Sequence, residues 1–192
     1  AYRTMASKSD WFIPVHPATD GALALGAIRE IFEQGWEATD FLRDHTEAPL
    51  LIKEDGMFLR MSDLGVEPTE TTNAQGQEIP VDPYVVWDEA SSSAVPLAQA
   101  TKPALGGVAP IEGIAVRTEM EMIREAVEPW TLEHTSEVTG VSVEDIQHLA
   151  HLYTQEGDVQ TDMKFGLNHY NNGMYSSKCV NSLLPVSGQM GR

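Results

Sequence analysis

Two loops of the sequence concentrate polar side chains in positions where a ligand could bind. The first covers residues 14–20 (Pro-Val-His-Pro-Ala-Thr-Asp), between the apolar run 11–15 and a helical pattern. A strand, a rigid bend and a helix would bring backbone N–H groups, the Thr19 hydroxyl and the Asp20 carboxylate to the carboxyl edge of a sheet, where open α/β folds bind ligands. A carboxylate there can accept two N–H bonds from the edge of a guanine base. The alternative is that Asp20 is only an N-cap.

The second loop covers residues 166–173 (Gly-Leu-Asn-His-Tyr-Asn-Asn-Gly). It joins an expected strand end at 164–167 to an expected helix at 174–186. Its side chains are hydrogen-bond donors and acceptors, and a loop before a helix N-terminus suits a phosphate or a ribose. A simple polar turn is the alternative interpretation.

General catalytic motifs are absent from the sequence. It contains no G-x-S-x-G, no P-loop and no G-x-G-x-x-G. His148 and His151 lie three residues apart on an expected helix and could share a metal ion, but a structural zinc site needs four ligands, so solvent-facing histidines are the simpler interpretation. Cys179 falls on the apolar side of a helix, which predicts a buried, unreactive thiol. We therefore assign no catalytic residue and no metal ligand from these patterns.

The composition narrows the possible partners. The 192 residues carry a formal net charge of −17, which disfavours nucleic acid and anionic membranes. No uninterrupted apolar stretch is long enough to cross a bilayer, so we expect no direct membrane insertion. One cysteine excludes an internal disulfide and leaves the cellular compartment open. Anionic ligands remain compatible with this charge, because a phosphate needs only local donors.

Periodicity predicts helices and strands in alternation, as in an α/β fold. The expected helices cover 22–34, 40–45, 118–127, 132–139, 142–153 and 174–186. We expect strands at 11–15 and 84–87, a hairpin of 50–52 with 57–59, and an exposed loop at 65–79. The region 50–118 therefore looks like an irregular insertion containing small strands.

Three ordered stretches match motifs of one enzyme family. Thr4–Leu23 resembles T-x-(S/T)-A-x-x-A-D-x-x-(L/I)-P-(I/V)-x-P-G-T-D-x-A-L, with Ala18 in place of the usual Gly. Trp130–Tyr153 is similar to Y-T-P-E-x-x-x-x-I-T-G-V-x-x-E-x-I-x-x-L-A. The segment 166–192 resembles G-x-x-x-H-x-x-N-G…L-x-x-L-x-G-N-x-G-R, with Gln189 for Asn and Lys178-Cys179 for a common Arg-Ala. The sequence thus resembles the molybdopterin oxidoreductases of the dimethyl sulfoxide reductase class.

The resemblance implies a fold and a cofactor. It implies an α/β fold, a Rossmann-like domain with a parallel sheet and helices on both faces, divided into residues 1–49, an irregular β-containing insertion at 50–118, and residues 119–192. The implied cofactor is bis(molybdopterin guanine dinucleotide) with molybdenum or tungsten. The expected cofactor-binding residues are those that match the family motifs: Pro17, Thr19, Asp20, Asn168, His169 and Gly173. Among them, Thr19 and Asp20 match the positions that recognise guanine.

The resemblance also implies what lies outside this chain. The family's metal ligand and the cysteines of its 4Fe–4S cluster precede this region, so we expect an internal piece of a catalytic subunit that is inactive alone. Its expected partners are the rest of its own subunit and an iron–sulfur electron-transfer subunit. The chemistry of the whole enzyme would be oxygen-atom transfer or electron and proton transfer at the metal. The competing hypothesis is a self-standing acidic α/β interaction domain without cofactor.

Overall fold

The computed structural model describes residues 6–191, and the chain divides into two compact units. Unit 1 combines residues 1–38 with 126–192, and unit 2 is residues 39–125. Helices and small strands are both present, so the expected mixed α/β composition is confirmed. None of the helices in the described part is long and apolar enough to cross a membrane.

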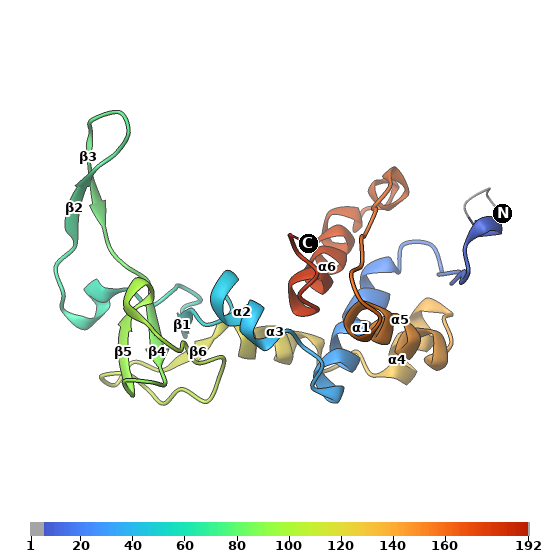
Figure 1. The fold of residues 1–192 in the computed structure, drawn as a ribbon, viewed down its shortest axis with the longest axis horizontal. Coiled ribbons are helices and arrows are strands. Elements are labelled where there is room, and N and C mark those ends of the chain that lie inside the picture. The colour runs from blue at the N-terminus through green and yellow to red at the C-terminus, as the bar shows by residue number, and fades with distance from the viewer. Residues whose placement is uncertain (1–5, 192) are drawn as a thin grey trace. The chain divides into compact units, whose positions relative to one another are not determined.

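Unit 1 is built around helix α1 (Asp20–Gln34). This helix packs against α4 (Leu132–Thr139), α5 (Val143–Gln155) and α6 (Gly173–Val186) (Figure 1). Its buried residues recur at helical spacing and form the core together with α5 and α6. The buried apolar core consists of Ala27, Ile28, Ile31, Val127, Ala150, Tyr153, Leu183 and Val186. Local signals set the helix ends: Ser142 accepts a hydrogen bond from the backbone N–H of Asp145, and Gly35 ends α1 with φ of 67°.

Small residues let the helices of unit 1 approach closely. A Cβ added at Gly26 of α1 would overlap the buried side chain of Thr135 on α4. A Cβ at Gly21 would lie 3.0 Å from the Cα of Ser176 on α6. The N-terminal ends of α1 and α6 therefore lie side by side.

The expected strand at 11–15 is wrong. Residues 11–16 form no strand, and Trp11 and Phe12 stay nearly half exposed. The segment instead lies along α5 and the end of α4: the Trp11 indole N–H donates to Asp145 at 2.8 Å and its ring stacks on His148. A strand needs a partner strand for its backbone, and the described part of unit 1 supplies none.

The second expected strand end is also wrong, and with it the parallel sheet. Residues 165–169 form a 3-10 turn, η4 (Phe165–His169), not a strand end. All three strand pairs among residues 6–191 are antiparallel, lie in unit 2 and contain two strands each. The described residues therefore contain helices of an α/β fold but no Rossmann-like parallel sheet, because the apolar runs expected to form it pair with no other strand.

Unit 2 begins with α2 (Thr39–His45) and ends in α3 (Glu119–Val127), which runs past its boundary. Strand β1 (Leu51–Lys53) pairs with β6 (Val116–Thr118). The expected turn around Asp55-Gly56 is present, because the N–H of Leu59 donates to the carbonyl of Leu51 at 2.7 Å. A small buried core of Leu51, Leu59, Val85, Ile111 and Val116 holds these segments together.

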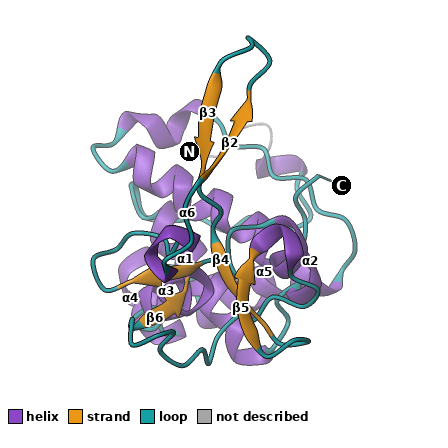
Figure 2. Ribbon diagram, turned by 90° about the vertical axis from the view of Figure 1, so that its left-hand side faces the viewer, coloured by secondary structure: helices purple, strands orange, loops and turns teal. Residues whose placement is uncertain are grey.

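Two further hairpins complete unit 2. Strand β4 (Val85–Asp88), expected from the sequence, pairs with β5 (Ser93–Pro96). The segment expected to be a loop at 65–79 instead contains β2 (Thr69–Thr72), paired with β3 (Glu78–Val81) (Figure 2). Threonines favour the extended strand, and the Asn73 side chain fixes its turn by accepting from the N–H of Gln77 at 2.9 Å. The hairpin is exposed, as the polar composition predicts.

Candidate functional site

The loop at residues 14–20 forms a tight turn that leads into α1. The N–H of Thr19 donates to the carbonyl of His16 at 3.2 Å, which closes a four-residue turn. Pro17 occupies its second position and Ala18 its third, with φ of 69°. Proline followed by a residue with positive φ defines a type II turn, whose third position favours glycine. The Thr19 hydroxyl also donates to the His16 carbonyl, at 2.8 Å, so it stabilises the turn and does not cap the helix.

This turn is attached to the end of α4. The N–H of His16 donates to the carbonyl of Thr139 at 2.8 Å, and its ring Nδ1 lies 3.2 Å from the carbonyl of Val138. Gly140 follows with φ of 72°, and a Cβ there would overlap the His16 ring. The position of the turn is therefore set by contacts with residues more than 100 positions away.

The second loop packs against the start of α6. Gly173, the first residue of that helix, donates its N–H to the carbonyl of Tyr170 at 2.9 Å. It is buried, and a Cβ there would overlap the carbonyl oxygen of Leu167. Gly173 therefore fixes the path of the loop between η4 and α6.

One hydrogen bond joins the two loops. The side-chain amide of Asn172 donates to the carbonyl of Ala18 at 2.8 Å. Asn172 is the N-cap residue of α6, yet its side chain caps no helix N–H. Because α1 and α6 begin side by side at Gly21 and Ser176, the positive ends of two helix dipoles also meet here. The two loops chosen from the sequence thus form one structural site.

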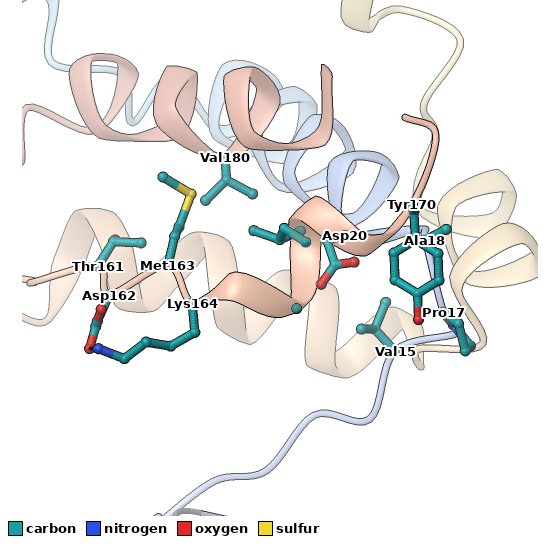
Figure 3. Close-up of a pocket in the computed structure, with 12 residues that line it drawn as sticks. Val15, Pro17, Ala18, Asp20, Thr161, Asp162, Met163, Lys164, Tyr170 and Val180 are labelled. Carbon is teal, nitrogen blue, oxygen red and sulfur yellow. Dashed lines mark ion pairs between the residues drawn. The ribbon is translucent and has the colours of Figure 1, made fainter. Parts of the chain in front are cut away.

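A cavity of about 720 Å³ lies between these loops (Figure 3). Residues from three segments line it: Val15, Pro17, Ala18 and Asp20; Thr161, Asp162, Met163, Lys164, Gly166, Leu167 and Tyr170; and Val180 of α6. Figure 3 shows Asp20 near the centre of the cavity, with Tyr170 and Pro17 on one side and Met163 and Val180 on the other. The volume is in the usual range for small-molecule sites.

The charges around the cavity differ in how they are engaged. Lys164 pairs with Asp162 at 2.5 Å, and both side chains are largely exposed. Within residues 6–191, the Asp20 carboxylate has no hydrogen-bond or ion-pair partner, although Asp20 is partly buried. An ionised carboxylate only accepts hydrogen bonds, so this part of the cavity suits a ligand that presents N–H or O–H donors.

Individual curated proteins match this sequence, whereas no family model does. The chain is 28% identical over its full length to the putative dimethyl sulfoxide reductase catalytic subunit of Halobacterium salinarum. It is 25% identical, again over its full length, to the alpha subunit of the dimethylsulfide dehydrogenase of Rhodovulum sulfidophilum. It is 30% identical over 84% of its length to the corresponding subunit of the sulfite dehydrogenase of Allochromatium vinosum. The chain belongs to the molybdopterin oxidoreductase family.

The match covers only part of each family member. The chain spans 22%, 21% and 16% of those three relatives, respectively, and these are catalytic subunits of reductases and dehydrogenases. In structure it resembles the acetylene hydratase of Pelobacter acetylenicus, with a TM-score of 0.56 and 14% identity, over 98% of this chain and 16% of that one. That likeness concerns the fold alone. The names of the relatives differ in substrate, so they do not define the reaction of this molybdopterin oxidoreductase chain.

The residues expected to bind the family's cofactor are placed unequally. Pro17 and Asp20 line the cavity, and Gly173 is buried behind it. Asn168 and His169 are exposed on η4 and are not among the lining residues. The Thr19 hydroxyl is engaged within its own turn.

Three contributors to the site were not singled out from the sequence. Tyr170 and Lys164 line the cavity, and Asn172 joins the two loops. Tyr170 lies inside the loop that was chosen, and an aromatic ring beside a ligand loop is a usable signal. Lys164 and Asn172 carry no such signal, because their roles depend on which distant residues lie beside them.

The remaining candidate groups have other surroundings. His148 stacks on Trp11, and His151 lies 3.1 Å from Glu156. Among the described residues, no group of three or more His, Cys, Asp or Glu is placed to hold a metal ion. Burial raises the pKa of the half-buried Cys179 thiol, which disfavours its reactive thiolate.

The cavity residues fit the nucleotide end of the family's cofactor. Asp20 offers an unpaired acceptor for the N–H groups of a guanine edge, and Tyr170 offers an aromatic surface. Lys164 and the two helix N-termini supply positive charge for phosphate in an otherwise acidic chain. A nucleotide is therefore chemically matched to residues on all sides of this cavity.

Proposed function

We propose that this chain is the portion of a molybdenum or tungsten oxidoreductase catalytic subunit that binds the guanine nucleotide of bis(molybdopterin guanine dinucleotide). The observation that carries the proposal is the Asn172–Ala18 hydrogen bond, which joins two loops 154 residues apart around one cavity. Both loops match cofactor motifs of the family, and Asp20 enters the cavity without a partner of its own. When bound, the cofactor supplies the transfer of oxygen atoms, or of electrons and protons, at its metal.

In this proposal the residues of the chain bind and orient the nucleotide. Asp20 accepts hydrogen bonds from the guanine edge, which distinguishes guanine from adenine. Lys164 and the N-termini of α1 and α6 attract the diphosphate. Pro17 holds the turn that carries Asp20, and Thr19 secures that turn through its hydrogen bond to His16. Asn168 and His169, exposed on η4, extend the binding surface beyond the cavity toward the rest of the cofactor.

The rest of the subunit completes the enzyme. We propose that its strands form the Rossmann-like parallel sheet against which the helices of unit 1 pack, with residues 50–118 as an insertion. Other parts of the subunit supply the metal ligand and any 4Fe–4S cluster, and an iron–sulfur subunit is the proposed electron-transfer partner. The isolated chain is then expected to bind nucleotide but to catalyse nothing.

Nucleotide titration of the 192-residue chain tests the proposal. Isothermal titration calorimetry with GDP and ADP should show tighter binding of GDP. Asp20→Asn should weaken GDP binding about tenfold or more and remove the preference for GDP, because a charged acceptor is lost. The matched control is Asp162→Asn, which removes an equal charge from the same cavity at a side chain that is already ion-paired.

Two outcomes would contradict the proposal. Equal affinity of the wild type for GDP and ADP would show that the site does not read guanine. Absence of nucleotide binding from a chain with native helix content would favour the acidic interaction domain, for which the net charge of −17 is the supporting observation.

A further inference from the structure

Tyr170 is the aromatic residue among the side chains that line the cavity. Its side chain is 42% exposed, and Figure 3 shows its ring beside the cavity, with Asp20 as the neighbouring charged group. No hydrogen bond or ring contact within the described residues engages the Tyr170 side chain. The ring is therefore accessible from the side on which a ligand would enter.

The backbone holds this ring in a fixed relation to Asp20. The carbonyl of Tyr170 accepts from the N–H of Gly173 at 2.9 Å, which closes the turn into α6. Two residues after Tyr170, Asn172 donates to the carbonyl of Ala18, which lies two residues before Asp20. The hydrogen bond that joins the loops thus lies between the ring and the carboxylate in both segments.

We propose that Tyr170 is the base-stacking residue of the site: its ring contacts the face of the base whose edge Asp20 reads. This inference rests on the proposed function, since it assumes that a nucleotide occupies the cavity. Aromatic rings stack on nucleobases with little preference between bases, because every base has a π-face. Tyr170 therefore contributes affinity, and Asp20 contributes selectivity for guanine.

The neighbouring aromatic residues do not fit this role. Phe165 is 73% exposed and lies edge-on to His169, with ring centroids 5.0 Å apart. Tyr175, on α6, is 64% exposed. Neither lines the cavity, and so Tyr175 offers a matched control for the removal of an exposed tyrosine ring from the same unit.

Substitution at Tyr170 separates the two contributions. We expect Tyr170→Leu to weaken GDP and ADP binding by a similar factor of about ten, so that the preference for GDP is retained. Tyr170→Phe keeps the ring and should bind within about twofold of the wild type. Tyr175→Leu should leave both affinities unchanged. Because Tyr170 is exposed, these changes should leave the unfolding temperature unaltered, which circular dichroism checks.

A spectroscopic measurement reports the stacking directly. In the wild type, the H8 proton of GDP should shift upfield on binding because it lies over an aromatic ring. This shift should persist in Tyr170→Phe and disappear in Tyr170→Leu at saturating GDP. A wild type that prefers GDP, with Tyr170→Leu unchanged in affinity and H8 shift, would overturn the stacking role and leave the proposed function intact. A wild type without nucleotide binding would overturn the proposed function, and the stacking role with it.

Discussion

Units 1 and 2 are stabilised in different ways. In unit 1, long helices bury aliphatic side chains such as Ile28 and Ile146, which have no exposed surface. In unit 2, the strands are at most four residues long, and carboxylates satisfy the backbone N–H groups between them. Asp88 accepts from three such groups, and Asp63 accepts from the N–H of Arg60 at 2.9 Å. Unit 1 should therefore be sensitive to lost volume, and unit 2 to lost charge.

The comparison also explains why the candidate site lies where it does. Long helices with small residues at their contacts hold two loops rigidly side by side, as a ligand site requires. The longest described hairpin of unit 2, β2–β3, is exposed on nearly every residue and lacks such support. Distant segments are joined more firmly in unit 1, although unit 2 has the larger share of strands.

The largest expected effect comes from a cavity in the core of unit 1. Ile28→Ala should reduce the free energy of unfolding by about 2–5 kcal/mol, because it removes buried methylene groups that the helices cannot replace. Urea unfolding measures the loss, and amide hydrogen exchange should show it in α1. Met174→Ala, at a side chain that is 59% exposed, is the control and should change stability by less than about 0.5 kcal/mol. Equal loss of protection in β4 and β5 would show that the units unfold together.

The second effect concerns a charge in unit 2. The backbone N–H of Lys102, helped by Ser91, lowers the pKa of Asp88 from 3.8 to about 2. The folded state therefore prefers the carboxylate, and its stabilisation is complete above about pH 4 and is lost as the pH falls through 2. Asp88→Asn should lower the unfolding temperature of unit 2 by several degrees at pH 7.

The same substitution should also flatten the acid dependence. Between pH 4 and 2 the wild type should lose stability faster than Asp88→Asn, and the two should converge at the acid end. Asp44→Asn removes the same charge from an exposed position of unit 2 and should do neither. Parallel pH profiles for wild type and Asp88→Asn would contradict the assigned role of these hydrogen bonds.

The helices could be predicted from the sequence because their signals are local. Apolar spacing, the Ser142 cap and the terminal glycines identified all six α-helices described within a few residues of their ends. The strands at 11–15 and 164–167 were wrong because a strand depends on a distant partner, and these segments have none. The loop at 65–79 was wrong for a local reason, since the turn formed by Asn73 was overlooked.

The site divides in the same way. Pro17 and Asp20 could be chosen because a bend before a helix is visible in the chain itself. The role of Asn172 could not, because it depends on a hydrogen bond to a carbonyl 154 residues away. The family resemblance supplied the positions of both loops but not the contact between them.

The smallest expected effect tests the turn that carries Asp20. Ala18 holds a φ of 69°, which costs a residue with a Cβ about 1–2 kcal/mol, and glycine is usual at this place in the family motif. Ala18→Gly relieves that strain but gives the unfolded chain more freedom, which offsets about 0.4–1 kcal/mol. The net gain in the free energy of unfolding should be about 0.5 kcal/mol, measured by urea unfolding. Ala22→Gly, the same change four residues later within α1, should instead lose about 0.5–1 kcal/mol. If both glycines destabilise alike, Ala18 is not strained, and the departure from the family motif has another cause.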